Sequence, residues 1–552
     1  MKKFIILSFL LSILTCKKQI NIEETWTKPR LSSNEQLANY VERISNENKI
    51  NFDDVNNQTA YIPSMCYTKT ENKHNPCYTC HNIGKEPNYN RDVTALFVYN
   101  FPESSNENPW KNLFITKTKN YSSEEMKNYI QTDNYLDVNG EITLQKNLPK
   151  DWKGYVPDCY FNFDKEGFDK DKEANLTGWR AYRYYPFPGT FFPTNGSIGD
   201  VMIRLPKYFA QDEDGNFNLE VYKANLSILE TSIKQRNINS ESIDEKKIDY
   251  DLNFDGIKTQ TEKVSFIFPD KKFTYVGLAK KLLEEKKIYL SGGLFPIGTE
   301  FLHSVRYIES DNDISLAKRF KELRYMRKHN YYNYAELYSF MMEEAKETKF
   351  KDRNLPENFE GDFQTGLYTG RGWTMQGFIE DKKGNLRPQT KEETLFCVGC
   401  HSGLGATKDG VFSFDRKIED KNDSWKHWKD KGLKNQSEKK IVSNNNTIGE
   451  YAFYLEMNHA GDEFRANSEI INNFFDSNNK LKPDNKEKLS NDISSLLYPS
   501  ANRANELNKA YRRIVEEQTY SLGRDSVIKS PTTVFKQVPK GQTTGLTLPE
   551  IH

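Results

Sequence analysis

Apolar residues recur at helical spacing in several stretches of this chain. The clearest helix is predicted over residues 34–45, where Ser33 and Gln36 match a capping box. Its apolar face is formed by Leu37, Tyr40, Val41 and Ile44. Further helices are predicted over residues 275–286, 315–347 and 484–519.

Strand signals fill the stretch between residues 150 and 300. Short aromatic or β-branched runs such as DVMIRLPKYF and VSFIFPD are broken there by Pro and Gly. The length of 552 residues also exceeds what one hydrophobic core usually supports. These patterns predict an α+β protein of more than one domain.

The N-terminus has the features of an export signal. Lys2 and Lys3 precede a largely apolar run over residues 4–14, which is too short to span a bilayer as a helix. The run ends in SILTC, which resembles the lipobox of bacterial lipoproteins, although Thr15 stands where that family usually has Gly or Ala. Cys16 is therefore the candidate lipidation site, and an ordinary signal peptide is the alternative.

The charge balance argues against a nucleic-acid partner. Lys plus Arg and Asp plus Glu each number 78, so the net charge is zero. Nucleic-acid binding needs a clustered positive field, which this composition does not predict.

Two short segments carry the strongest chemical signal. Cys77, Cys80 and His81 lie in KHNPCYTCHNIG, and Cys397, Cys400 and His401 lie in LFCVGCHSGLG. The chain has only 7 Cys and 8 His, so two C-x-x-C-H segments are not expected by chance. This pattern is the attachment signature of c-type haem: both thiols add to the porphyrin vinyl groups, and the histidine binds the iron.

Other sites built on paired cysteines fit less well. A zinc site made from all four thiols would not require a histidine after each pair. A thioredoxin-like redox pair is expected within a βαβ pattern, which is missing around both segments.

With these two segments and its export signal, the chain resembles the bacterial di-haem cytochromes c. The resemblance implies two covalent haem c groups, with His81 and His401 as proximal iron ligands. The local sequence patterns predict a helical, cytochrome c-like region around the second haem and a mixed, strand-bearing region after the first. Redox proteins of the cell envelope are the implied partners, and the oligomeric state is left open.

The expected organisation has five parts. Residues 1–16 are a signal peptide, 17–50 a tether and first helix, 51–300 the first haem region, 301–480 the second haem region, and 481–552 helices with an irregular tail. Thr390 and Glu393 predict a capped helix that leads into Cys397.

The sixth iron ligands are predicted only as candidates. His303 lies in the apolar stretch GTEFLHSVRY, and His74 lies shortly before the first segment. Met457 follows His401 at a distance similar to the Cys-His to Met spacing of small cytochromes c. Met375 is a further candidate, whereas His427 is predicted to be a surface residue.

Two features stand apart from the haem segments. Asp251, Asn253, Asp255 and Glu262 fit the D-x-N-x-D-G-x5-E calcium loop, and an Asp- and Asn-rich hairpin turn is the alternative. Cys66 and Cys159 remain unassigned, and in an oxidising compartment they predict a disulfide.

Two functions follow from the resemblance. The expected function is electron transfer in the bacterial periplasm or on the outer surface, with the protein held to the membrane by a lipid anchor. The alternative is a di-haem redox enzyme of the cytochrome c peroxidase kind. The two segments are common to both classes and do not distinguish them.

Overall fold

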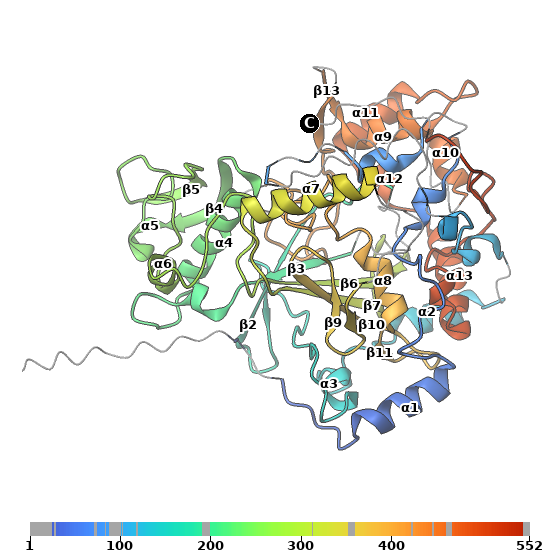
Figure 1. Cartoon of the computed structure of the whole chain (residues 1–552), viewed down its shortest axis with the longest axis horizontal. Helices are drawn as coiled ribbons and strands as arrows, with labels where there is room; N and C mark the ends of the chain where they lie inside the picture. The colour runs from blue at the N-terminus through green and yellow to red at the C-terminus, as the bar shows by residue number, and fades with distance from the viewer. Residues whose placement is uncertain are drawn as a thin grey trace, which may run out of the picture.

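The computed structural model describes residues 25–544 apart from 27–28, 71–73, 83, 85, 88–100, 102, 117–119, 190–198, 312, 351–358, 421–422, 444–445 and 460–465. Its architecture is α+β, as predicted: an antiparallel sheet lies at the centre, and helices surround it (Figure 1). The proposed lipidation site, Cys16, lies outside the described residues.

The central sheet has nine antiparallel strands. They follow the order β1-β2-β3-β6-β7-β10-β9-β8, and β11 pairs with β10. The strands are β1 (Phe168–Lys170), β2 (Leu176–Tyr182), β3 (Val201–Arg204), β6 (Glu300–Glu309), β7 (Ser315–Lys328), β8 (Gly361–Asp362), β9 (Gly366–Tyr368), β10 (Trp373–Glu380) and β11 (Leu386–Pro388). Because β3 pairs with β6, strands from both sides of residue 300 belong to the same sheet.

A small lobe extends from one side of the sheet (Figure 1). It contains α4 (Leu219–Lys234), β4 (Ile238–Asp244), α5 (Glu245–Ile248), β5 (Gln260–Val264) and α6 (Leu278–Glu284). The side chain of Asn218 caps α4, which is buried over nearly its whole length. The helix α6 is shorter than predicted because Gly277, at φ 64°, has a non-helical backbone.

The remaining helices lie around the sheet (Figure 1). They are α1 (Leu37–Asn48), α2 (Ser123–Gln131), α3 (Thr143–Asn147), α7 (Tyr334–Phe350), α8 (Lys391–Val398), α9 (Glu450–Asn458), α10 (Ser468–Phe474), α11 (Pro483–Asn491), α12 (Ser494–Leu497) and α13 (Ala501–Glu517). The helices α9 to α13 gather on the side opposite the lobe, together with the hairpin of β12 (Lys440–Ser443) and β13 (Asn446–Gly449) (Figure 1). No helix among the described residues combines the length and apolar character needed to cross a bilayer.

The helix predicted over residues 315–347 is wrong in its first half. Residues 315–328 form β7, which lies between β6 and β10, and helix begins only at Tyr334. The side chain of Arg319 is buried in β7 and pairs with Glu380 of β10 at 2.5 Å. A partner so distant in the sequence cannot be recognised from apolar spacing.

The predicted helices near both ends of the chain are present, with one shifted boundary. The first begins at Leu37, whose main-chain N–H donates to Asp151 Oδ1 at 2.7 Å, so Ser33 does not cap it. Over residues 484–519 the chain forms α11, α12 and α13, and the α13 face that includes Leu507 and Tyr511 is buried.

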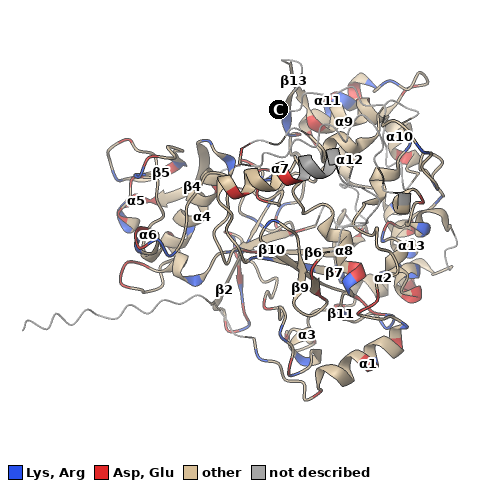
Figure 2. Ribbon diagram, in the orientation of Figure 1, with Lys and Arg blue, Asp and Glu red and all other residues tan. Residues whose placement is uncertain are grey.

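The sheet separates two hydrophobic clusters. Ile203 and Phe301 belong to the larger cluster, whereas their neighbours Met202 and Leu302 belong to another. Successive side chains of a strand point to opposite faces, so the clusters lie on opposite sides of the sheet. Charged side chains of both signs are interspersed over the ribbon, in keeping with the zero net charge (Figure 2).

Candidate functional site

The first C-x-x-C-H segment forms a tight turn. The 3-10 helix η2 (Pro76–Thr79) is capped by Asn75, whose side chain accepts from the main-chain N–H of Cys77 at 2.9 Å. The N–H groups of Cys80 and His81 both donate to the carbonyl of Cys77, at 3.2 and 2.8 Å. One helical turn therefore separates the two thiols, as attachment to one porphyrin requires.

The second segment continues from a helix, as predicted. In α8 the hydroxyl of Thr390 accepts from the N–H of Glu393 at 3.1 Å, and the Glu393 side chain accepts from the N–H of Thr390 at 2.9 Å. The helix ends at Val398, and the N–H of Cys400 donates to the carbonyl of Cys397 at 3.3 Å. The capping box thus fixes the start of the helix that delivers Cys397.

The two segments pack directly against each other. The main-chain N–H of Ala406, just after the second segment, donates to the carbonyl of Cys80 in the first at 3.0 Å. A Cβ on Gly399 would lie 1.6 Å from the carbonyl oxygen of Tyr61, and one on Gly405 would lie 2.0 Å from that of Asn82. Glycine at both positions permits this close approach of the two backbones.

Cys66 lies beside both segments and not beside Cys159. Burial raises the pKa of Cys66 well above its ordinary value, and the neighbouring Cys77 and Cys400 raise it further. All described cysteines are free thiols, so the predicted Cys66–Cys159 disulfide is wrong. Cys66 packs against one hydrophobic cluster, and Cys159 belongs to the cluster on the other side of the sheet.

The imidazole of His401 lies in surroundings that disfavour its charged form. Burial is the main cause, and the charges of Arg324 and His303 add to it, so that the pKa is lowered to about 4 and the ring is neutral at physiological pH. Its Nδ1 atom is buried without a hydrogen-bond partner. The neutral imidazole is the form that ligates iron.

His303 is held so that one ring nitrogen remains available. It lies on β6 directly opposite Arg324 of β7. Its Nδ1 is hydrogen-bonded to the main-chain carbonyl of Asp200, which leaves Nε2 for a ligand. Because His303 contributes to the pKa of His401, the two imidazoles are within electrostatic range of each other.

The prediction that His427 is a surface residue is wrong. Its side chain is buried, and Nε2 lies 2.9 Å from Asp200 Oδ2. The same carboxylate accepts from the N–H and the hydroxyl of Ser304, at 2.8 and 2.7 Å. Asp200 thereby joins β6 to the segment that carries His427, and no sequence motif marks this role.

Met457 is associated with the first segment, although its spacing suggested the second. It lies near the end of α9 and packs against the same buried cluster as Cys77, a cluster that includes Tyr78. The neighbouring Asn458 donates to the Tyr78 hydroxyl at 3.1 Å. His74 lies half-buried just before η2, also at the first segment.

The candidate calcium loop is closed by its own hydrogen bonds. Asp251 Oδ2 accepts from the N–H of Gly256 at 2.8 Å, and Asn253 Oδ1 accepts from the N–H of Asp255 at 2.9 Å. Glu262 is exposed on β5. In the described part of the chain, no three His, Cys, Asp or Glu side chains gather as a metal site, so calcium binding stays a prediction.

Comparisons with known proteins identify the class of this chain. A family model described as “-like lipoprotein” matches residues 48–494. An “Uncharacterized lipoprotein” of Aquifex aeolicus (strain VF5) is 33% identical over 541 residues, which cover 85% of this chain and 86% of the relative. No solved structure matches the chain. The chain belongs to this lipoprotein family, which agrees with the lipobox-like sequence at Cys16.

Proposed function

We propose that this lipoprotein carries two covalently bound haem c groups and transfers electrons between redox proteins of the bacterial cell envelope. The observation that carries the proposal is the hydrogen bond between Ala406 and Cys80. Two attachment segments that are far apart in sequence are thereby packed together, which would place two redox groups close enough to exchange electrons.

The residues present fit this cofactor. Each segment supplies two free thiols one turn apart, and His401 supplies a neutral imidazole with an orphaned nitrogen. His303 is the favoured sixth ligand for the second haem, and Met457 or His74 for the first. When bound, haem iron supplies a one-electron Fe(III)/Fe(II) couple.

The cysteines of the two segments are buried or half-buried. Burial raises the pKa of both Cys77 and Cys400 to about 12, with further contributions from Cys80 and Cys397 respectively. A largely buried setting of this kind suits electron transfer because little solvent must reorganise when the charge changes.

The experiment is to produce the protein in a bacterium with a haem-attachment system. The intact mass should include two haems, and the c-type spectrum should survive acid–acetone extraction. Replacing Cys77 and Cys80 by Ser should remove one haem, and replacing Cys397 and Cys400 should remove the other. A mass without covalent haem would refute the proposal.

The same preparation separates a carrier from an enzyme. A carrier should have two six-coordinate haems in both oxidation states and no peroxide turnover. If one haem is five-coordinate and high-spin and consumes peroxide with a reduced donor, the protein is a peroxidase and not an electron carrier.

A further inference from the structure

Two buried guanidinium groups share one carboxylate beside the second haem-attachment segment. Arg324 Nε donates to Glu322 Oε2 at 2.8 Å, and Arg524 Nη1 donates to the same oxygen at 3.0 Å. The side chains of Glu322 and Arg524 are each 2% exposed, and that of Arg324 is 21% exposed. The two positive charges therefore share one counterion, Glu322, in a largely buried environment.

The two arginines lie beside the second segment and its candidate sixth ligand, His303. Arg524 Nη1 lies 3.9 Å from the sulfur of Cys397, and another of its nitrogens donates to the carbonyl of Glu393 in α8. The free Cys397 thiol here stands for the thioether sulfur of an attached haem. Arg324 of β7 lies directly opposite His303 of β6, the favoured sixth ligand of the second haem.

Two neighbouring carboxylates have cationic partners of their own. Arg387 and Glu393 neutralise each other through two hydrogen bonds, at 2.9 and 2.8 Å. Asp200, beside His303, is faced by the positive charge of Arg306.

The two arginines also keep donors without partners. Arg324 Nη2 and Arg524 Nε are buried and make no hydrogen bond. Their group with Glu322, which we call the Arg–Glu–Arg cluster, has two positive charges and one negative charge.

We propose that the Arg–Glu–Arg cluster raises the reduction potential of the haem attached at Cys397 and Cys400, which makes that site the stronger electron acceptor for a given set of ligands. This inference rests on the proposed function. Reduction takes one electron from a donor, lowers the iron from Fe(III) to Fe(II) and removes one positive charge. A fixed positive charge nearby in a low dielectric favours that reduced state.

The test is a spectroelectrochemical titration of the purified di-haem protein and its variants, with haem content checked by mass. Arg324→Gln removes one positive charge, Arg324→Lys retains it, and Glu322→Gln removes the negative charge. Arg319→Gln is the matched control, because Arg319 lies on the same strand and also forms a buried pair with a glutamate, Glu380.

We expect Arg324→Gln to lower one of the two potentials by about 59 mV or more, a tenfold change for a one-electron couple. Glu322→Gln should shift the same potential upward. Arg324→Lys and Arg319→Gln should shift it by only a small fraction of the change expected for Arg324→Gln. Arg524→Gln provides the same test as Arg324→Gln if the latter does not fold.

The double variant Cys77→Ser, Cys80→Ser retains only the second haem. Its titration shows which of the two potentials belongs to that haem. Two unchanged potentials in an Arg324→Gln protein with both haems would overturn this inference and leave the proposed function standing. A shift confined to the first haem would also overturn it. Absence of covalent haem from the parent protein would overturn both proposals.

Discussion

The side-chain amide of Asn458 donates a hydrogen bond to the phenol of Tyr78 at 3.1 Å. Asn458 is the last residue of α9, and Tyr78 lies between the two cysteines of the first C-x-x-C-H segment. This bond fixes the end of α9 against that segment. It therefore places Met457, the neighbour of Asn458, at the first segment.

Met457→Ala should change the absorption spectrum and lower the potential of the first haem alone, because a methionine ligand raises the potential of haem iron. The measurement is a redox titration of the Cys397→Ser, Cys400→Ser protein, which retains only that haem. Met202→Leu is the control, since Met202 is buried in β3 and exchange of Met for Leu is well tolerated in a core. An unchanged first haem would exclude Met457 as its ligand.

His303→Ala should convert the second haem from a six-coordinate to a five-coordinate form. The reason is that the main-chain carbonyl of Asp200 is hydrogen-bonded to His303 Nδ1 and leaves Nε2 available, within electrostatic range of His401. The readout is the spin-state spectrum of the Cys77→Ser, Cys80→Ser protein. His329→Ala is the control, because His329 follows β7 and does not contribute to the pKa of His401. If both variants retain a six-coordinate spectrum, His303 has only a structural role.

Local signals in the sequence were sufficient for some of these features and insufficient for others. The capping box of Thr390 and Glu393 involves residues three apart, so it could be recognised and is present. The ion pair of Arg324 with Glu322 is also local, but its third member, Arg524, comes from a loop far along the chain. Nothing in the spacing of β7 indicates that its charges are buried.

The candidate site as a whole is also only partly predictable from local sequence signals. The two C-x-x-C-H segments were evident from the sequence, but the contact of Ala406 with Cys80 depends on how the chain closes around the sheet. The register of the strands likewise determines on which side of the sheet a cysteine lies. This is why the pairing of Cys66 with Cys159 was predicted wrongly.

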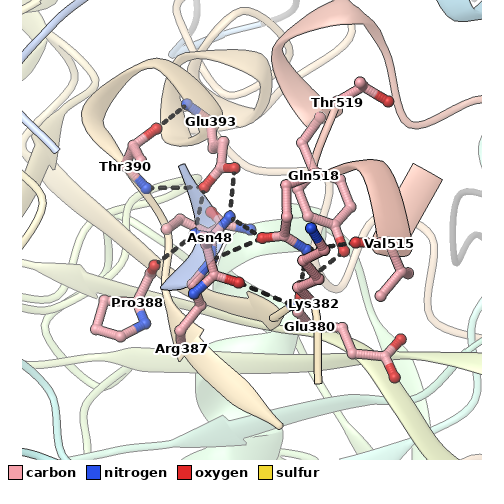
Figure 3. Close-up of polar contacts among 12 residues, drawn as sticks. Asn48, Glu380, Lys382, Arg387, Pro388, Thr390, Glu393, Val515, Gln518 and Thr519 are labelled. Atoms are coloured by element: carbon pink, nitrogen blue, oxygen red, sulfur yellow. Dashed lines mark hydrogen bonds and ion pairs between the residues drawn. The ribbon is translucent and has the colours of Figure 1, made fainter. Parts of the chain in front are cut away.

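Removing one partner of the buried Arg387–Glu393 pair should strongly destabilise the protein. The two side chains are 0% and 4% exposed, and Arg387 also donates to Gln518 Oε1 and to the carbonyl of Pro388 (Figure 3). Arg387→Met leaves Glu393 charged and buried, which typically costs about 3–5 kcal/mol.

Urea unfolding of the haem-loaded protein measures this cost. The double variant Arg387→Met, Glu393→Gln should recover part of the loss, because it removes the unpaired charge. Arg43→Ala provides the surface comparison, since its pair with Glu35 is partly exposed and such pairs contribute at most about 1 kcal/mol. Equal losses for Arg387→Met and Arg43→Ala would contradict the prediction.

Cys16→Ser should move the protein from the membrane fraction to the soluble fraction. A diacyl anchor binds a bilayer far more firmly than a single chain, and the described residues contain no helix able to span one. Fractionation of cells that produce each form, followed by immunoblotting, measures the partition. Haem content should be the same in both forms. Membrane retention of the Ser variant would show that another feature anchors the protein.

Asp169 should make the free energy of unfolding depend on pH between about 4 and 6. Burial raises the pKa of its carboxyl from 3.8 to about 6, although the main-chain N–H groups of Tyr160 and Asn162 and the Thr177 hydroxyl donate to it. The folded state therefore retains a proton that the unfolded state has lost. Stability from this group is complete below pH 4 and is lost as the pH rises through 6. The loss amounts to about 3 kcal/mol for a shift of about two units.

The measurement compares Asp169→Asn with the parent protein across pH 4 to 7, because asparagine has the same shape and does not titrate. The stability of the parent should fall relative to that of Asp169→Asn over this range, whatever the constant cost of the substitution. Asp53→Asn, at an exposed position, should show no such relative change. Parallel stability profiles for the parent and Asp169→Asn would contradict the prediction, because they would mean that the carboxyl has the same pKa in the folded and the unfolded protein.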